Sequence, residues 1–430
     1  MRRFPAVLAS LAVSAGLLAW GAGPSGALPP GSADTPAVSH DRVLPASGAL
    51  TFGFVGRASV TVDAGLESDA EVAAISGSNL FVVDRELEDG QVKPGVRVFD
   101  IATPASPVSV SRIDLAGYGA EINSVAAYGP YVVAALEADP RTSPGRIVLM
   151  RWNGKSLNVV RAARTGALPD MVAFSPDGRR VLVANEGEPS CYGDGCVDPE
   201  GSLTLVDIAA LARGAAGAST QIGFAAFNSQ ASALRKSGVR IFGPGATVAQ
   251  DLEPEYITFD PSNPARAWVS LQENNALATV DLAARKVTRI VALGTKNHNN
   301  KGMGLDASDR DGRVNIRNWP VRGMYQPDAI AAYVVKGQTY IVSANEGDAR
   351  DYDGFAEELR VGDDDYTLNP NVFPDLASLK KDENLGRLTV TAQGAKKSGR
   401  LLDEIMAFGS RSISIWNAGG TQVWDSGDAL

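Results

Sequence analysis

The chain has 430 residues and a formal net charge of −9, and 44% of its residues are hydrophobic. It also holds 45 glycines and 24 prolines, as expected for many short strands joined by turns, and it is too apolar for a disordered protein. The acidic balance argues against nucleic acid or an anionic membrane as a partner, because both require a basic face. Cations are the ligands that such a surface favours.

The N-terminus has the pattern of a secretory signal peptide over residues 1–27. Arg2 and Arg3 precede an apolar run from Ala6 to Trp20, and small residues follow at Ser25–Ala27. A membrane anchor is the alternative, but the apolar run is shorter than the roughly 20 residues that a span needs. We therefore expect a protein that is secreted or held at the cell surface, with a flexible linker over residues 28–50.

The rest of the chain, residues 51–430, repeats one plan. Each unit opens with an acidic residue and continues with two short apolar strands; the opening acids are Glu71, Glu121, Asp170, Glu255, Asp328 and Glu404. Spacings of 49 to 85 residues between them fit four-stranded units lengthened by insertions. This predicts an all-β fold, a β-propeller of about six to seven blades.

The clearest unit runs from Leu168 to Asp207. Its apolar runs at 171–174, 181–184 and 203–208 predict three strands, and Ser175–Gly178 has the composition of a tight turn. The last unit stops near Trp424. We therefore expect an incomplete C-terminus and an open or gapped ring, whose edge strands near Phe52 and Trp424 are unpaired or pair with each other.

Three insertions interrupt the later units. Phe224–Ser237 predicts a helix, because apolar residues recur on one helical face and Gly238 follows as a C-terminal cap. The second insertion covers Gly294–Gln326. The third covers Asp348–Glu404 and contains a possible short helix at Leu376–Lys381.

The two cysteines, Cys191 and Cys196, lie in one loop. In an exported chain they predict a disulfide bond that stiffens this loop. Two cysteines with no nearby histidine do not make an ordinary zinc site.

Acidic residues are expected to meet at one mouth of the propeller channel. In each blade the opening acid and the end of the second strand lie on the same face, and the phrases Asn185–Glu188 and Asn345–Asp348 are nearly identical. The candidate ligands at this mouth are Asp170, Glu186, Glu188, Glu255, Glu273, Asp328, Glu346 and Asp348. Oxygen ligands without His or Cys suit calcium or another divalent cation.

Other acids extend this expected ring, namely Glu71, Asp84, Glu121, Glu137 and Glu404. The alternative for each single acid is that it caps a turn or pairs with an arginine such as Arg85, Arg322 or Arg350.

A second candidate cation site is the loop of residues 306–315, through Asp306, Asp309 and Asp311. An EF-hand does not fit, because Ala307 and Asn318 occupy the first and twelfth positions, where acids are expected. The loop either binds a cation in a geometry other than that of an EF-hand or forms an Asp-rich turn.

Catalytic motifs are sparse. The sequence contains no Walker loop, GxSxG or dinucleotide fingerprint, and a Ser-His-Asp triad has only His298 to use. Metal-assisted hydrolysis, with Lys296, His298 and Arg317 as phosphate contacts, is left open. The catalytic residues are therefore unknown, and the sequence leans toward a protein without enzymatic activity.

Several long phrases, including LPDMVAFSPDGRRVLVANEGEP, GLDASDRDGRVNIRNWPVRGMYQPDAIAAY and SANEGDARDY, resemble the choice-of-anchor I domain family. The resemblance covers nearly everything from Phe52 onward. It implies an exported bacterial propeller of a family often labelled alkaline-phosphatase-like or related to a mesenchyme-specific cell-surface glycoprotein. It brings no established catalytic residues.

The leading hypothesis is an exported propeller that binds a cation and presents a surface to a ligand or partner. The alternative is a calcium-dependent phosphoesterase, because calcium-dependent phytases are similar exported propellers. The ligand, the partner, the mode of attachment and the oligomeric state stay open.

Overall fold

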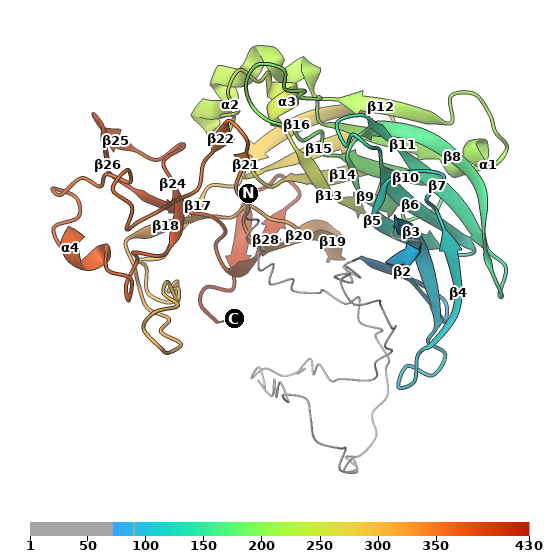
Figure 1. Ribbon diagram of the computed structural model, residues 1–430, viewed down its shortest axis with the longest axis horizontal. Helices are drawn as coiled ribbons and strands as arrows, with labels where there is room; N and C mark the ends of the chain where they lie inside the picture. The colour runs from blue at the N-terminus through green and yellow to red at the C-terminus, as the bar shows by residue number, and fades with distance from the viewer. Residues whose placement is uncertain (1–71, 89–90, 430) are drawn as a thin grey trace, which may run out of the picture.

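A computed structural model describes residues 72–88 and 91–429, and Figure 1 shows its ribbon. The expected signal peptide and linker, together with Phe52 and Glu71, lie outside the described residues. Five four-stranded antiparallel sheets follow one another along the chain. The chain is all-β and propeller-like, which confirms the predicted fold class.

The first two blades are continuous in sequence. Blade one consists of β1 (Ala73–Ser76), β2 (Asn79–Glu88), β3 (Gln91–Asp100) and β4 (Val108–Asp114). Blade two consists of β5 (Glu121–Tyr128), β6 (Tyr131–Glu137), β7 (Pro144–Trp152) and β8 (Leu157–Ala167).

Blades three and four follow the same order. Blade three consists of β9 (Pro169–Phe174), β10 (Arg180–Asn185), β11 (Ser202–Asp207) and β12 (Ser219–Gly223). Blade four consists of β13 (Pro254–Asp260), β14 (Asn263–Leu271), β15 (Ala276–Asp281) and β16 (Lys286–Ala292). The predicted strands and the Ser175–Gly178 turn of blade three are confirmed.

Blade five is split by a long insertion. It consists of β19 (Ile330–Val335), β20 (Gln338–Asn345), β28 (Ser412–Asn417) and β29 (Gln422–Asp425). The prediction that Glu404 opens a sixth unit of its own is therefore wrong. The strand after Glu404 joins the insertion, and Ser412–Asn417 pairs with β20 as the third strand of blade five.

The insertion and the segment between blades four and five together form a mixed sheet. Its strands, in spatial order, are β17 (Thr295–Asn297), β18 (Val321–Met324), β27 (Ile405–Ala407), β24 (Thr389–Thr391) and β23 (Leu359–Arg360). Strands β18 and β27 run parallel, which no hairpin can produce. Two short hairpins complete it: β21 (Asp351–Tyr352) with β22 (Phe355–Ala356), and β25 (Lys397–Ser398) with β26 (Leu401–Leu402).

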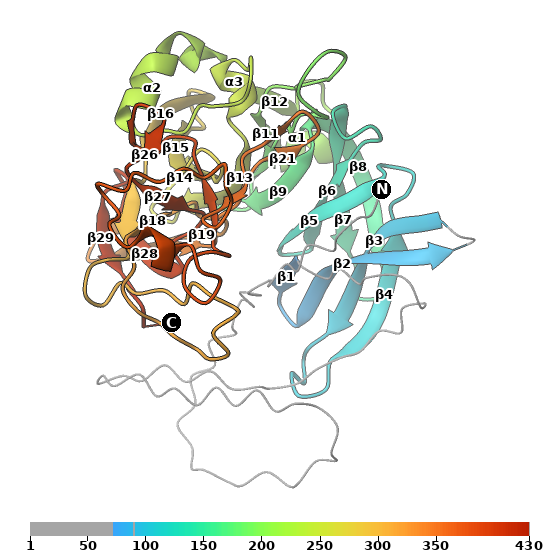
Figure 2. The ribbon, with the colours of Figure 1, turned by 60° about the vertical axis from the view of Figure 1, so that its left-hand side comes forward.

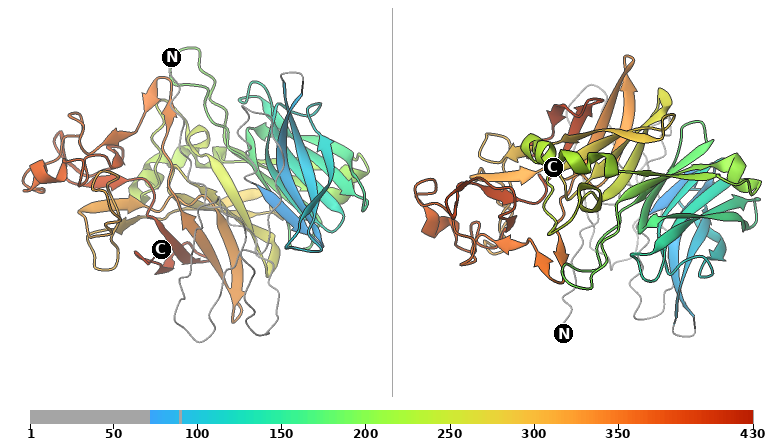
Figure 3. Two further views of the ribbon diagram at one scale, coloured as in Figure 1. Left: turned by 60° about the horizontal axis from the view of Figure 1, so that its bottom comes forward. Right: turned by 90° about the horizontal axis from the view of Figure 1, so that it is seen from above.

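The insertion sheet has a hydrophobic core of its own. Trp319, Met324, Tyr366, Leu385 and Ile405 are buried together there. Figure 1 and the left view of Figure 3 place this sheet on the opposite side of the molecule from blades one and two. It packs as a second unit attached to blade five.

Helices are few and short in the described residues. They are α1 (Ile208–Ala212), α2 (Ala231–Ser237), α3 (Val248–Asp251), α4 (Leu376–Leu379) and a 3₁₀ helix at Ala225–Gln230. The helix predicted over Phe224–Ser237 is present, with its first half tightened to 3₁₀ geometry. It ends at Gly238 with φ +99°, as the cap required. No described helix has both the length and the apolar character of a membrane span.

The innermost strands of successive blades lie side by side, from β1 to β5, β9, β13 and β19. Among the described residues, β19 and β1 do not form such a packed pair. Figure 2 shows blade one and blade five on either side of this opening. In the part of the chain that the structure describes, the ring is therefore open between blades one and five.

The loop that carries the cysteines reaches across to the insertion. Cys191 and Cys196 form a disulfide with their Cα atoms 5.2 Å apart, inside the usual interval of about 4.4–6.8 Å. The amide of Tyr192 donates to the carbonyl of Asp353 at 2.8 Å, and the Tyr192 ring meets the rings of Tyr352 and Phe355. The disulfide loop of blade three is thereby docked on the β21–β22 hairpin.

Candidate functional site

A short tripeptide, any residue followed by proline and an acid, opens the innermost strands of blades three, four and five. The three copies are Leu168–Asp170, Glu253–Glu255 and Gln326–Asp328. Leu168 and Gln326 have φ values of +47° and +37°, in the left-handed region that side chains rarely adopt. Such strain costs about 1–3 kcal/mol per residue and clusters at ligand sites. The motif repeatedly places an acid at the same mouth of the ring.

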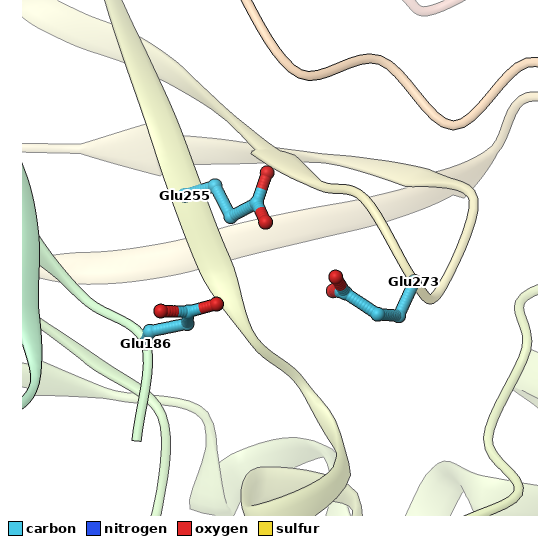
Figure 4. A group of neighbouring side chains, drawn as sticks. All are labelled: Glu186, Glu255 and Glu273. Atoms are coloured by element: carbon cyan, nitrogen blue, oxygen red, sulfur yellow. The ribbon is translucent and has the colours of Figure 1, made fainter. Parts of the chain in front are cut away.

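Three glutamates meet at this mouth. Glu186 follows the end of β10, Glu255 lies in β13, and Glu273 comes two residues after β14. Each offers a carboxylate oxygen, and these oxygens all lie within 4.8 Å of one another (Figure 4). At an effective dielectric near 20, two charges at this distance repel by about 3.5 kcal/mol. The triad is therefore costly unless protons or a cation neutralise it.

Burial and mutual repulsion disfavour the charged forms of these carboxyls. Desolvation raises the pKa of Glu186, Glu255 and Glu273 well above the ordinary value. Negative neighbours add to the effect: Asp170 raises the pKa of both Glu186 and Glu255. Burial likewise raises the pKa of Asp348, with a further contribution from Asp328. These acids therefore behave as one electrostatic cluster.

A buried arginine supports one side of the cluster. Arg350, only 1% exposed, donates from Nη1 to Asp251 Oδ1 at 2.5 Å and from Nε to Glu253 Oε2 at 3.3 Å. One guanidinium thus faces two carboxylates. Burial is the largest influence on Glu253 and outweighs Arg350, so its pKa rises to about 7. Arg350 balances only part of the negative charge.

Glu273 has a carboxylate oxygen with no partner. Oε2 of Glu273 is buried and accepts no hydrogen bond from the described residues, and the side chain is 3% exposed. The backbone oxygen of Glu273 is fixed by Arg240 Nη1 at 2.6 Å. A buried acceptor without a donor is costly, so this oxygen is available to a proton, a hydrogen-bond donor or a cation.

Glu255 has a different environment. The Gln272 amide lies beside it, and with its nitrogen toward the carboxylate it donates to Oε2 at 2.6 Å and to Oε1 at 3.0 Å. This contact fixes the Glu255 carboxylate beside the other two glutamates. Oxygen-only ligands in this number suit a hard divalent cation, with water or further oxygens completing its shell.

A family model, the choice-of-anchor I domain, matches residues 72–430. The chain belongs to the choice-of-anchor I domain family. No curated protein sequence is similar enough to this chain to count as a match.

Some solved structures are distantly similar to this choice-of-anchor I domain. Hydrazine synthase from Kuenenia stuttgartiensis is 12% identical with a TM-score of 0.36, over 64% of this chain and 80% of that one. Apo AztD from Citrobacter koseri is 11% identical with a TM-score of 0.32, over 64% of this chain and 55% of that one. A functionally unknown protein from Desulfotomaculum acetoxidans is 12% identical with a TM-score of 0.33, over 81% and 82%.

Not every acid expected at the mouth of the choice-of-anchor I domain joins the cluster. Asp170, Asp328 and Asp348 act on the triad electrostatically. Glu188 instead forms an ion pair with Arg141. Glu346 is exposed to solvent, although it occupies the place in its phrase that Glu186 has in the other copy.

Most of the acids expected to extend the ring have partners of their own, and Glu71 lies outside the described residues. Glu121 pairs with Arg85 at 2.6 Å, and Glu404 pairs with Lys396 at 2.8 Å. Asp84 lies 2.5 Å from Arg112 and 3.0 Å from Arg97. Glu137 accepts a hydrogen bond from Asn123, although burial raises its pKa. The arginine-pairing alternative describes most of these acids.

The three acids of the loop of residues 306–315 all have protein partners. Asp309 is bound by Arg387 at 2.6 Å, Asp311 accepts from Asn315 Nδ2 at 2.8 Å, and Asp306 accepts from the Asn315 amide at 3.1 Å. Of the two interpretations, the Asp-rich turn is the one that these contacts favour.

The residues considered as phosphate contacts are engaged elsewhere. Lys296 Nζ is buried against the Gly427 carbonyl at 2.5 Å and Asp425 Oδ1 at 3.2 Å. His298 Nδ1 contacts the Met303 carbonyl at 2.8 Å, and burial lowers its pKa. Arg317 stacks on the Trp319 ring. Each of these side chains therefore has a partner outside the glutamate triad, and His298 also lines the cleft that contains Asp348.

Sequence reasoning missed two components of the site. It did not single out Glu253, although the repeated proline tripeptide marks its position. It named Arg350 only as a general pairing partner, and nothing local indicates that Arg350 is buried against Asp251 and Glu253, 99 and 97 residues away.

Two loops of blade five are locked together beside the mouth. Gln326 binds both, since its Oε1 accepts from the Gly409 amide at 3.2 Å and its Nε2 donates to the Asp348 carbonyl at 2.6 Å. Gly409 has φ +68°, and a Cβ there would overlap the carbonyl oxygen of Glu346.

We expect Gly409→Ala to lower the free energy of unfolding by about 1–3 kcal/mol, because the added methyl forces these loops apart. Urea denaturation measures it. Gly399→Ala is the matched control, because Gly399 has φ +65° with open space around its Cα. Equal losses in the two variants would show that backbone conformation, rather than the close approach, causes the effect.

Proposed function

We propose that this chain is an exported binding protein that holds a divalent cation, calcium in the first instance, at the acidic mouth of its propeller. Glu186, Glu255 and Glu273 would be the ligands from the protein. The observation that carries the proposal is their convergence within 4.8 Å, together with the partnerless buried Oε2 of Glu273. Membership of the choice-of-anchor I family supports a location outside the cytoplasm or at the cell surface.

The cation would have a structural and a recognition role. Its charge offsets the repulsion within the triad, so it ties blade three to blade four at the mouth. Its remaining coordination positions stay open to water or to an oxygen of a ligand. The binding surface would therefore be complete only in the loaded protein.

We expect calcium to raise the melting temperature of the purified protein. A concentration a hundredfold above the dissociation constant stabilises the folded state by about 2.7 kcal/mol. With an unfolding entropy of about 2.1 cal/mol/K per residue, this corresponds to about 3–4 °C for a domain of this size. Melts in calcium and in chelator measure it, and melts in magnesium and manganese test the selectivity.

The double variant Glu186→Gln with Glu255→Gln separates the cation from other causes. In chelator at about pH 8 it should melt higher than the parent, because two repelling charges are gone. In calcium it should show no further increase. Glu121→Gln is the control, because it neutralises an acid outside the triad, the opening acid of blade two. This variant should retain the full increase in melting temperature with calcium. A parent protein that melts identically in calcium and chelator would remove the site from this account.

The phosphoesterase alternative predicts catalysis in addition to binding. It requires turnover of a generic phosphate ester that depends on calcium and disappears in chelator. Lys296, His298 and Arg317 are engaged with partners outside the glutamate triad, and this supports the binding role over the phosphoesterase.

A further inference from the structure

A cleft lies between blade five and the insertion, next to the acidic mouth. Its volume is about 830 Å³, and its walls include Asp348, Arg360, Arg387, Phe408 and Arg411. Asp348 also belongs to the acidic cluster. The cleft therefore adjoins the proposed cation site, and Asp348 is the residue that they share.

Most charged groups of this cleft already have partners. Arg387 pairs with Asp309 at 2.6 Å, Arg313 lies 3.6 Å from Asp311, and Arg360 donates to the Arg387 carbonyl at 3.0 Å. Arg411 differs: among residues 72–88 and 91–429, its guanidinium has no ion pair or hydrogen bond. It is exposed in the cleft and free to receive an anion.

The backbone of Arg411 is held in an unfavourable conformation. Its φ is +51°, a region in which glycine is the easy choice and arginine is strained. The Arg411 amide donates to the Asn345 carbonyl at 3.2 Å. The Asn345 side chain is itself buried, with Nδ2 donating to Ser412 at 3.1 Å and to Ser414 at 2.7 Å. A rigid support thus presents an arginine where stability alone would favour glycine.

We propose that Arg411 forms an anion subsite in this cleft, for the carboxylate or phosphate group of a ligand. A guanidinium binds either group through two parallel hydrogen bonds, which suits an oxyanion better than a halide. A ligand held there would lie beside the acidic mouth, because Asp348 lines both sites. The subsite goes beyond the proposed cation binding and does not depend on it.

The test uses Arg411→Gly, which removes the guanidinium and relieves the strained backbone. Binding of inorganic phosphate and of succinate is measured by calorimetry on the full chain in chelator, so that failure of the cation site does not affect the result. We expect saturable binding of at least one anion to the parent. Arg411→Gly should weaken it at least tenfold, about 1.4 kcal/mol, while melting at the same temperature or higher.

The control is Arg400→Gln, an exposed arginine of the β25–β26 hairpin that does not line the cleft. It should bind both anions as the parent does. Binding of phosphate alone would assign the subsite to a phosphorylated ligand, and binding of succinate would assign it to a carboxylate. The proposal is overturned if neither anion saturates the parent at millimolar concentration, or if Arg411→Gly binds as tightly as the parent.

Discussion

Replacing Arg350 with methionine should lower the free energy of unfolding by about 3–5 kcal/mol. The guanidinium is fully buried between Asp251 and Glu253, and its Nη2 also donates to the Asp251 carbonyl at 2.6 Å. Its removal would leave two buried carboxyls beside the acidic triad with no counter-charge. Urea denaturation of the parent and of Arg350→Met, both in chelator, measures the loss.

Arg85→Met is the matched control, because the Arg85–Glu121 pair lies at the surface, with side chains 26% and 43% exposed. Exposed pairs contribute about 0–1 kcal/mol, so this variant should stay close to the parent. Adding Glu253→Gln to Arg350→Met should restore part of the lost stability, since one of the stranded carboxyls is then neutral. A loss of less than about 1 kcal/mol in Arg350→Met would contradict the account.

Without a cation, the protein should become less stable as the pH rises from about 5 to about 8. The pKa of Glu253 in the folded state is about 7, above its ordinary value of 4.5. The stability that comes from its protonated form is fully present below about pH 4.5 and is lost as the pH rises through 7. For Glu253 alone this amounts to about 3 kcal/mol. The raised pKa values of Glu186, Glu255 and Glu273 act in the same direction.

Calcium should reverse this trend. The cation binds the ionised carboxylates and competes with protons, so its stabilisation should be larger at about pH 8 than at about pH 5. Melting temperatures across this interval, in chelator and in calcium, give the two curves. The variant Glu186→Gln with Glu255→Gln should lose the calcium effect and show a shallower pH dependence in chelator, because Glu253 and Glu273 still titrate. A chelated parent that gains stability steadily between about pH 5 and pH 8 would contradict the prediction.

Local sequence predicted the blades well and the long-range pairing poorly. The turn at Ser175–Gly178 and the strands around it are encoded within a few residues, so they could be read directly. The partner of Ser412–Asn417 could not, because its third-strand position depends on β20, across the whole insertion. The parallel pairing of β18 with β27 could not be predicted for the same reason, because the two strands are far apart in the sequence.

The candidate site also has residues that the local sequence predicted and residues that it did not. Repeated phrases identified Glu186, Glu255 and Glu273, because the position of an acid within a blade determines which mouth it occupies. Repetition also predicted Glu346 as a ligand, but its side chain is exposed. A shared phrase does not determine whether the side chain is buried at the centre of the ring. The partners that neutralise an acid, such as Arg85 for Glu121 or Arg350 for Glu253, come from neighbouring strands or distant loops and leave no local pattern.

The split of blade five has a consequence for the order of folding. In blade three, Asn185 meets its third-strand partner Ser202 after only 17 residues, whereas in blade five Asn345 meets Ser412 after 67 (412 − 345). Loop-closure entropy and contact order make such distant pairing slow relative to hairpins. Blade five should therefore assemble last, after the insertion has collapsed around its own core. Because Gln326, Asp348 and Arg411 all depend on that blade, the anion subsite should form only at the end of folding, later than the glutamate triad of blades three and four and later than most of the β-structure seen by circular dichroism.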